Sequence, residues 1–379
     1  MRIFENLNID FLGKRKIFYV VSTAVFLLGM LSIIFRGLQF GIDFKGGSEI
    51  VIEFEKPIDI SALRNSLSEI GLGSIEVKTF GAETGVLIRT EIQDIPADIY
   101  PKVKDKISQD ILTILPGVPF RQVDSALNSV TYGFDNADTA KIISSGLFAE
   151  GFQASRESDD IANRNVIVRV GVADWVKENL RTTIKDNPFK VLREDRIGPK
   201  VGAELKRDAS IAVILALVGI LIYLAFRFKF IFAAGAVAAL FHDVLLTIGL
   251  FSLLYNVIPG LNLEIDLTIV AAFLTLVGYS INDTVIVFDR VRENLQLHKT
   301  GNLYEQINLA INKTMSRTII TGVTTILAIL ILMFFGGEVL RAFAFTLFFG
   351  IIVGTYSSIF VASALVLEYS LKSKKTVEF

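Results

Sequence analysis

Six stretches of this chain are apolar over a length that would cross a lipid bilayer. The hydrocarbon core is about 30 Å thick, which roughly 20 helical residues cross, and only helices and closed barrels satisfy their backbone hydrogen bonds there. Hydrophobic residues make up 52% of the 379 residues, which also favours a membrane protein. We therefore expect six transmembrane helices, at residues 17–37, 209–226, 230–256, 265–289, 318–336 and 342–369.

Lysine and arginine residues predict the orientation of these helices. They gather before the first apolar stretch, in the turn between the second and third, between the fourth and fifth, and after the last, whereas the segment 257–264 has none. Cytoplasmic loops are enriched in these residues. We therefore expect cytoplasmic ends at 1–16 and 370–379 and an extracytoplasmic segment at 38–208. No signal-peptide cleavage site follows the first stretch, so we expect it to be retained.

The segment 38–208 has the patterns of an α+β domain. Residues 48–54 (SEIVIEF) alternate as a half-buried strand does, and the next apolar residues recur at helical spacing. The order strand, helix, strand, strand, helix then recurs, with a second copy that starts near 129–134 and a final strand at 189–198. We expect two interlocked ferredoxin-like (split-βαβ) units, each with helices on one face of an antiparallel sheet.

Composition and motifs argue against several classes of function. The chain has no cysteine, and its two histidines, His242 and His298, lack the spacing of a metal site. The segment 38–208 has no histidine, no nucleophile elbow and no phosphate-binding glycine loop. The net charge of −1 comes without a basic face for nucleic acid. We therefore expect no enzyme activity, metal, cofactor or nucleic-acid partner.

Ionisable residues lie inside the apolar stretches, where they are costly. Asp283 and Arg317 belong to the fourth stretch and the start of the fifth, and His242 and Asp243 interrupt the third. A charge near the bilayer centre costs roughly 2.5–3.5 kcal/mol on insertion scales, so it is rare unless it is paired or lines a water path. These four residues are our candidates for a proton-transfer site.

Polar neighbours extend this candidate site. Asn282 lies beside Asp283, while Thr321 and Thr324 follow Arg317 at i+4 and i+7 on one helix face. An arginine near the aspartate would favour its ionised form. The alternative for Arg317 is plain anchoring at the membrane surface, which its long stem permits.

His242 and Asp243 are adjacent, so their side chains point about 100° apart and cannot face the same neighbouring helix. One of them is expected to face the centre of the bundle while the other bonds a neighbouring helix. A structural hydrogen bond is the alternative to a role in proton transfer for both.

Two further patterns concern packing. The segment 290–317 is amphipathic, with Tyr304, Ile307, Ile311 and Met315 at helical spacing, and we expect it to lie along the cytoplasmic surface. Gly350 and Gly354 form a G-x-x-x-G motif, which is typical of close helix packing.

Five motifs together resemble the SecF proteins of the SecD/SecF family. They are GIDFKGG at 41–47, GPKVGAEL at 198–205, FHDVLLTIGLFSL at 241–253, YSINDTVIVFDRVREN at 279–294 and SRTIITGVTT at 316–325. The resemblance covers the N-terminal FLGKRK, all six spans and both edges of the soluble segment. It departs from the family pattern within 118–190, because SecF proteins commonly carry one split-βαβ unit and this chain has about twice that.

The resemblance implies a bundle of the resistance-nodulation-division type in the bacterial inner membrane. It also implies a SecD partner, a place beside the SecYEG channel, an unfolded protein substrate, contact with lipid, and use of the proton-motive force. In that family, the residues that match Asp283 and Arg317 are tied to proton conduction. Gly41, Asp43, Gly46 and Gly47 would then form a coupling hinge outside the membrane, with glycines that adopt unusual backbone angles.

Two other functions stay open at this point. A small-molecule or lipid exporter of the same superfamily would need a wide apolar cleft in the outer domain. A non-transporting assembly subunit of a membrane channel would tolerate neutral residues at Asp283 and Arg317.

Overall fold

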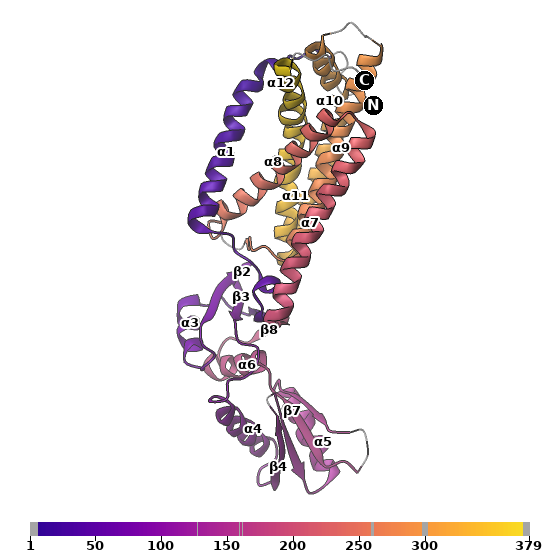
Figure 1. The fold of residues 1–379 in the computed structure, drawn as a ribbon. Coiled ribbons are helices and arrows are strands. Elements are labelled where there is room, and N and C mark those ends of the chain that lie inside the picture. Colours follow the sequence, from indigo (N-terminus) through magenta and orange to yellow (C-terminus); the bar gives the residue numbers. More distant parts are fainter. Residues whose placement is uncertain are drawn as a thin grey trace. The chain divides into compact units, whose positions relative to one another are not determined.

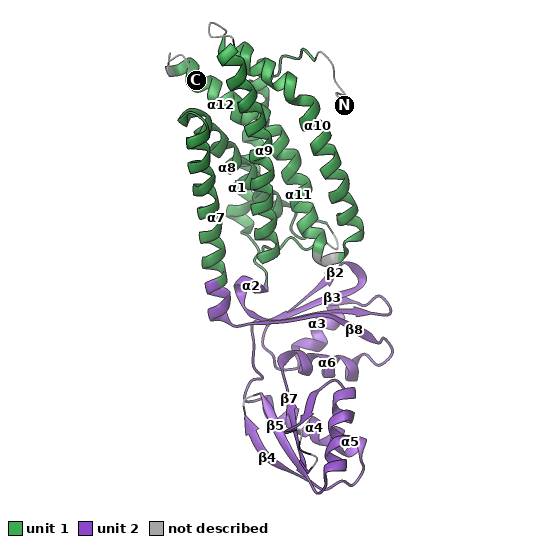
Figure 2. Cartoon of the chain, turned by 90° about the vertical axis from the view of Figure 1, so that its right-hand side faces the viewer, with its two compact units in different colours: residues 1–41, 205–379 green, residues 42–204 purple. Residues whose placement is uncertain are grey.

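The computed structural model describes residues 7–126, 128–158, 160, 162–258, 261–297 and 302–373. They form two compact units (Figure 2), a helical unit of residues 1–41 and 205–379 and an α+β unit of residues 42–204. His298 and the outer ends of both predicted cytoplasmic tails lie outside the described residues.

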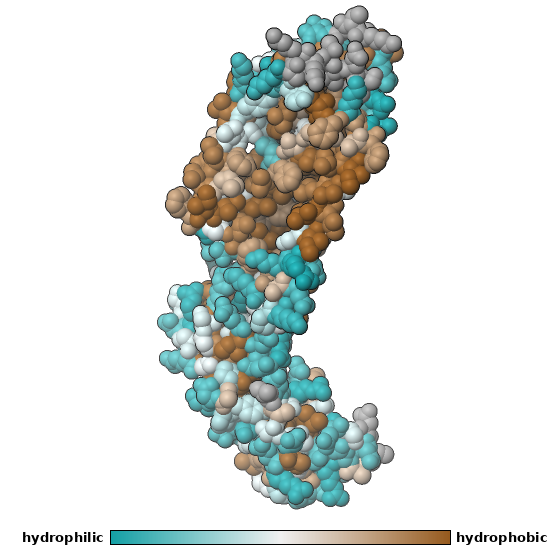
Figure 3. All heavy atoms as spheres, viewed as in Figure 1, coloured by the Kyte–Doolittle hydropathy of each residue, from teal (hydrophilic) through white to brown (hydrophobic). Residues whose placement is uncertain are grey.

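The helical unit contains six helical spans that are long and apolar enough to cross a membrane, counted over the described residues. Apolar side chains cover much of the outside of this unit (Figure 3). Together with the antiparallel sheets of the other unit, these spans confirm the predicted fold class. The helices are α1 (Arg15–Arg36, after the 3-10 turn η1, Leu12–Lys14), α7 (Pro199–Arg227), α8 (Phe230–Leu254), α9 (Leu267–Leu297), α10 (Leu303–Phe335), and α11 (Gly337–Ser357), which continues through the π turn η2 (Ser358–Ala362) into α12 (Ser363–Ser373).

Glycines allow these helices to approach one another closely. A Cβ atom added to Gly29 of α1 would lie 2.9 Å from the Cα of Gly249 of α8. Gly350 and Gly354 of α11 face α9 in the same way, since an added Cβ atom would lie 2.5 Å from Leu276 and 3.0 Å from Ser280. The G-x-x-x-G motif therefore packs α11 against α9 within this chain.

Within the described residues, the segment 290–317 does not form a separate helix. Its two ends belong to longer helices, because α9 runs to Leu297 and α10 runs unbroken from Leu303 to Phe335. The apolar face is covered by protein, since Ile307 and Ile311 are buried in a core that includes Leu12. The apolar pattern therefore packs against the N-terminal Leu12 and against other helices of the bundle, through residues such as Phe232 and Phe288.

The α+β unit holds two four-stranded antiparallel sheets (Figure 1). The first has the order β2-β3-β1-β8 and the second the order β4-β5-β7-β6. The strands are β1 (Gly47–Phe54), β2 (Ile75–Phe80), β3 (Ala82–Thr90), β4 (Phe120–Ala126), β5 (Ser129–Phe134), β6 (Gln153–Arg156), β7 (Asn165–Arg169) and β8 (Phe189–Ile197). The helices are α2 (Ile42–Lys45), α3 (Ile60–Ser68), α4 (Tyr100–Ile114), α5 (Ala137–Ala149) and α6 (Val172–Thr183).

The second sheet is inserted into the first unit of this domain. The elements β1, α3, β2, β3, α6 and β8 have the order βαββαβ, and α4 through β7 enter between β3 and α6. Apolar residues of both sheets and their helices, such as Ile52, Ile107 and Val168, form one continuous core. The sequence missed β4, because its residues are almost all exposed and so lack the alternation of a half-buried strand.

Candidate functional site

Asp243 lies at the centre of a polar cluster inside the helical unit. It belongs to α8 and is 1% exposed. Its Oδ2 accepts hydrogen bonds from the hydroxyls of Ser280 in α9, at 2.6 Å, and Ser357 in α11, at 2.7 Å. Its Oδ1 lies 3.0 Å from Nδ1 of His242. The protein therefore solvates this carboxyl group with three partners, as a buried polar group requires.

His242 extends the same cluster to α1. Its Nε2 is hydrogen-bonded to the hydroxyl of Ser22, and its ring is 6.3 Å from that of Tyr356, at an interplanar angle of 29°. The Tyr356 hydroxyl donates to the carbonyl oxygen of Phe18 at 2.8 Å. His242 therefore faces α1 while Asp243 faces α9 and α11, as expected from their 100° separation. Ser22, Ser357 and Tyr356 were missed, because single hydroxyls in apolar helices do not show which face they occupy.

Asp283 of α9 is another buried carboxyl group of the bundle, at 2% exposed. Its Oδ1 lies 3.5 Å from the hydroxyl of Thr318 in α10, at the outer limit of a hydrogen bond. Its Oδ2 is buried and makes no hydrogen bond within 3.5 Å among the residues that the structure describes, although the Thr355 hydroxyl of α11 also interacts with this carboxyl group. An ionised carboxylate is thus poorly solvated here, and a carboxyl group that gains and loses a proton suits such a place.

Arg317 directly precedes Thr318 in α10, and its own side chain is exposed. It contributes electrostatically at Asp283, yet within the described ranges no ion pair joins the two residues. Asn282 is exposed, so it does not line the site with Asp283. Thr321 and Thr324 donate to their own helix, to the carbonyl oxygens of residues 317 and 320. The predicted polar stripe therefore lies beside the site, and the hydroxyls of Thr318 and Thr355 interact with Asp283.

The glycine motif at the start of the α+β unit has the backbone angles that were expected at two positions. Gly46 and Gly47 have φ of +74° and +115°. A Cβ atom added to Gly202, in the motif that precedes the second span, would lie 3.2 Å from the nitrogen of Gly46 and 3.3 Å from the carbonyl oxygen of half-buried Asp43. The two motifs that flank the soluble segment therefore pack backbone to backbone.

Gly41 precedes this junction and behaves differently. Its φ is not positive, and its N–H donates to the carbonyl oxygen of Ile265 at 2.9 Å. Of the four predicted coupling residues, Gly41 is hydrogen-bonded to the loop before α9 in the helical unit, while Asp43, Gly46 and Gly47 belong to the α+β unit.

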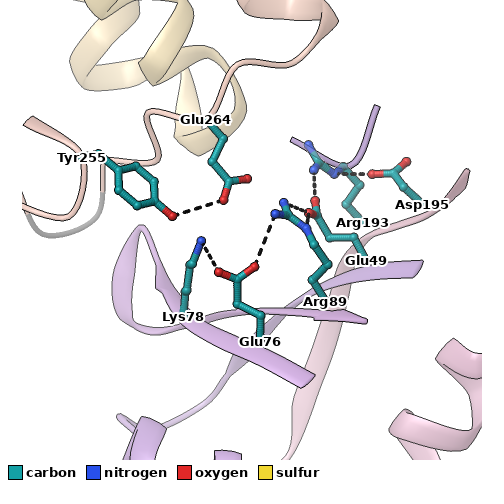
Figure 4. A network of polar contacts seen from close by, with 8 residues as sticks. All are labelled: Glu49, Glu76, Lys78, Arg89, Arg193, Asp195, Tyr255 and Glu264. Carbon is teal, nitrogen blue, oxygen red and sulfur yellow. Dashed lines mark hydrogen bonds and ion pairs between the residues drawn. The ribbon is translucent and has the colours of Figure 1, made fainter. Parts of the chain in front are cut away.

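A row of charged side chains crosses one face of the first sheet, and sequence analysis did not find it. Glu49 is 1% exposed and accepts from Nε of Arg89 at 2.9 Å and from Arg193. Glu49 and Glu76 are both register partners of Arg89, so the charges share one face. The row comprises Lys78, Glu76, Arg89, Glu49, Arg193 and Asp195 (Figure 4). Since the buried Glu49 has two arginine partners, we expect the loss of either arginine to destabilise the sheet.

Metal binding has no support in the described part of the chain, where no three histidine, cysteine, aspartate or glutamate side chains are grouped as ligands. The polar cluster has hydroxyl, imidazole and carboxyl groups, which are chemically able to donate and accept protons.

Comparison with known proteins identifies two regions of the chain. Residues 176–372 match the model of the protein-export membrane protein SecD/SecF C-terminal domain, and residues 31–58 match the SecD/SecF GG motif. The second match contains the glycine motif described above.

Curated relatives are similar over nearly the whole chain. The protein translocase subunit SecF of Rhodothermus marinus is 40% identical over 368 residues, which cover 97% of this chain and 95% of the relative. That of Calditerrivibrio nitroreducens is 36% identical, with the same coverage of each chain. That of Pseudomonas aeruginosa is 30% identical and covers 98% of this chain and 94% of the relative.

Solved structures show the same architecture. The crystal structure of SecDF, a translocon-associated membrane protein from Thermus thermophilus, matches with a TM-score of 0.68 and 28% identity over 97% of this chain. SecDF in its super-membrane-facing form matches with a TM-score of 0.56 and 30% identity over 98%. This chain spans 39% and 40% of those two longer chains.

Proposed function

Because this chain belongs to the SecD/SecF family of protein-export membrane proteins, we propose that it uses the proton-motive force to assist the export of unfolded proteins across the bacterial inner membrane. It acts as an accessory subunit of the translocase and not as an enzyme. Its partners are a SecD subunit, the SecYEG channel and the translocating chain. The longer SecDF chains, of which this chain spans about two fifths, support a SecD partner.

The observation that carries the proposal is the environment of Asp283. The carboxyl group is 2% exposed in an apolar helix, and one of its oxygens makes no hydrogen bond within 3.5 Å among the described residues. A residue that only stabilised the bundle would have better partners, as Asp243 does. Asp283 is therefore the group that takes up and releases the proton.

The proposed cycle couples this proton to helix movement. A proton that enters from outside neutralises Asp283 and weakens its attraction to Arg317, which lets α9 and α10 shift. Asp243 accepts hydrogen bonds from α9 and α11, and His242 is hydrogen-bonded to α1, so these bonds transmit the helix movement across the bundle. The Asp43–Gly47 junction, which follows α1 in the chain, passes it to the α+β unit, and that unit holds and releases the translocating chain.

The orientation belongs to the same proposal. Basic residues next to the spans support cytoplasmic termini and an extracytoplasmic α+β unit. The exposed apolar surface of α1, α7 and α10 supports contact with lipid and with the helices of SecD.

Export driven by a proton gradient in membrane vesicles tests the proposal. We expect Asp283→Asn and Arg317→Met to reduce the gradient-dependent component by about tenfold or more, at matched abundance and with the complex intact. Asp289→Asn is the matched control, since Asp289 is on the same helix and pairs with the exposed Arg227 at 3.0 Å. Normal gradient-dependent export by Asp283→Asn would mean that the charges are structural and that the chain is an assembly subunit.

A further inference from the structure

The last span contains a π-helical turn at its most buried point. α11 ends at Ser357, η2 occupies Ser358–Ala362, and α12 begins at Ser363. The side chains of Ser357, Ser358 and Ser363 are completely buried. Single π turns are uncommon and often occur at functional sites. This turn begins directly after the residue that donates a hydrogen bond to Asp243.

Two contacts with α8 set the face that the last span presents to it. Ser357 bonds Asp243, and a Cβ atom added to Gly235 would lie 2.9 Å from Val366 and 3.3 Å from the Ala362 carbonyl oxygen. A regular α-helix between residues 357 and 366 would turn through about 900°, which places Val366 about 180° from Ser357. Because the π turn absorbs roughly one extra residue, the separation falls to about 80°. The π turn therefore lets both contacts form at once.

One hydroxyl group adds a hydrogen bond to this turn. Ser363 donates to the carbonyl oxygen of Ser358 at 2.8 Å, five residues earlier, which is the spacing that a π turn closes. Ser358 uses its own hydroxyl differently, since it donates to the carbonyl oxygen of Thr355 at 3.0 Å within the preceding helix. Removing the Ser363 hydroxyl would leave a buried carbonyl oxygen with one fewer donor.

Aromatic contacts connect the same turn to the first span. The ring of Phe360 stacks on that of Phe18 in α1 with 3.7 Å between centroids, and Tyr356 lies 5.5 Å from Phe360. Tyr356 also donates to the Phe18 carbonyl oxygen. A change in the register of the last span would therefore move both the hydrogen bond to Asp243 and the packing against α1.

We infer that Ser363 is a positioning residue for proton-coupled export, because it stabilises the π turn that keeps Ser357 on Asp243 while Ala362 and Val366 stay on Gly235. The inference rests on the proposed function and adds to it a residue that touches neither buried aspartate in the described structure. The hydroxyl of residue 363, and not its size, is the property that matters.

Gradient-dependent export in vesicles that contain the complete complex tests this inference. Ser363→Ala is expected to lower the gradient-dependent component about tenfold, roughly the effect of one buried hydrogen bond. Ser363→Thr keeps a hydroxyl and is expected to restore at least half of it. Ser358→Ala is the matched control, because it removes a hydroxyl from the same turn, leaves the Ser358 carbonyl in place, and is expected to change export less than twofold.

The outcomes separate the inference from the proposed function when Asp283→Asn is measured beside them. If Asp283→Asn loses gradient-dependent export and Ser363→Ala keeps it, the positioning role is wrong and the proposed function stands. An equal loss in Ser363→Ala and Ser358→Ala, or no recovery in Ser363→Thr, would also overturn the positioning role. If Asp283→Asn exports normally, the proposed function fails.

Discussion

The charged row on the first sheet gives a stability prediction with a magnitude. Glu49 is 1% exposed and Arg89 is 5% exposed, so Arg89→Met leaves a buried carboxylate with one partner in place of two. Breaking a buried ion pair from one side costs about 3–5 kcal/mol. We expect about 3 kcal/mol, the lower end of this range, because Arg193 still pairs with Glu49.

Replacing both partners should cost less than replacing one. In the double variant Glu49→Leu, Arg89→Met, no buried carboxylate remains at position 49, and a buried pair replaced by apolar residues is often close to neutral. We expect a loss of about 1 kcal/mol, which is about 2 kcal/mol less than the loss expected for Arg89→Met alone. The exposed pair Arg196–Asp94, with side chains 47% and 46% exposed, is the control, and Arg196→Met should cost less than about 1 kcal/mol.

Thermal unfolding of the purified protein in detergent measures these differences. For a unit of 150–250 residues, about 1 kcal/mol shifts Tm by about 2–4 °C, so Arg89→Met should lower the Tm of the α+β unit by about 6–12 °C. The double variant should recover most of that loss. A Tm shift for Arg89→Met no larger than that for Arg196→Met would refute the claim that the buried Glu49 depends on Arg89.

Two further predictions concern the same unit. Gly46→Ala places a non-glycine residue at φ of +74° with its Cβ atom 3.0 Å from the Pro199 backbone, and it should lower the free energy of unfolding by roughly 2–3 kcal/mol. Gly117→Ala, at φ of +77° with nothing within 4 Å, should cost only about 1 kcal/mol, and equal losses in a thermal melt would contradict the packing argument. Burial alone would lower the pKa of Lys177, but its hydrogen bonds and ion pairs with Asp174 and Glu194 together outweigh burial and raise the pKa above its ordinary value of 10.5. Lys177→Met should therefore lower the free energy of unfolding by roughly 1–2 kcal/mol below pH 10.5. The difference in stability between this variant and the wild type should shrink as the pH rises through the raised pKa. A difference that does not depend on pH would exclude the ion pairs as its cause.

Sequence patterns predicted the fold class because the long apolar spans and the strand alternation are both strong signals. The apolar spans and the alternation in strands such as 48–54 follow from burial of one helix face or one sheet face. The assignment of helices to sheets was harder. Tyr100 of α4 donates to the carbonyl oxygen of Ser129 in the second sheet, and α6 packs on the first sheet, although α4 directly follows the strands of the first. Chain order alone does not show that one unit is inserted into another.

The candidate site could be predicted only in part. Buried charges are costly wherever they occur, so Asp283 and Asp243 could be identified from their places in apolar stretches. Their partners depend on which helices are neighbours, and the sequence does not contain that information directly. Asn282 is exposed although it adjoins Asp283, while Thr318 and Ser357 reach the two aspartates from other helices. The π turn at Ser358–Ala362 has no sequence pattern of its own, because serines and apolar residues also occur in regular helices.

Proton uptake is the most direct test of the claim that Asp283 carries the proton. The complete complex would be reconstituted in vesicles with a pH-sensitive dye inside and supplied with a translocating substrate under a proton gradient. We predict substrate-stimulated proton entry for the wild type and for Asp289→Asn, and entry at the level of protein-free vesicles for Asp283→Asn. Equal substrate-stimulated entry in Asp283→Asn and the wild type would contradict the account, because the proton would then cross without this carboxyl group.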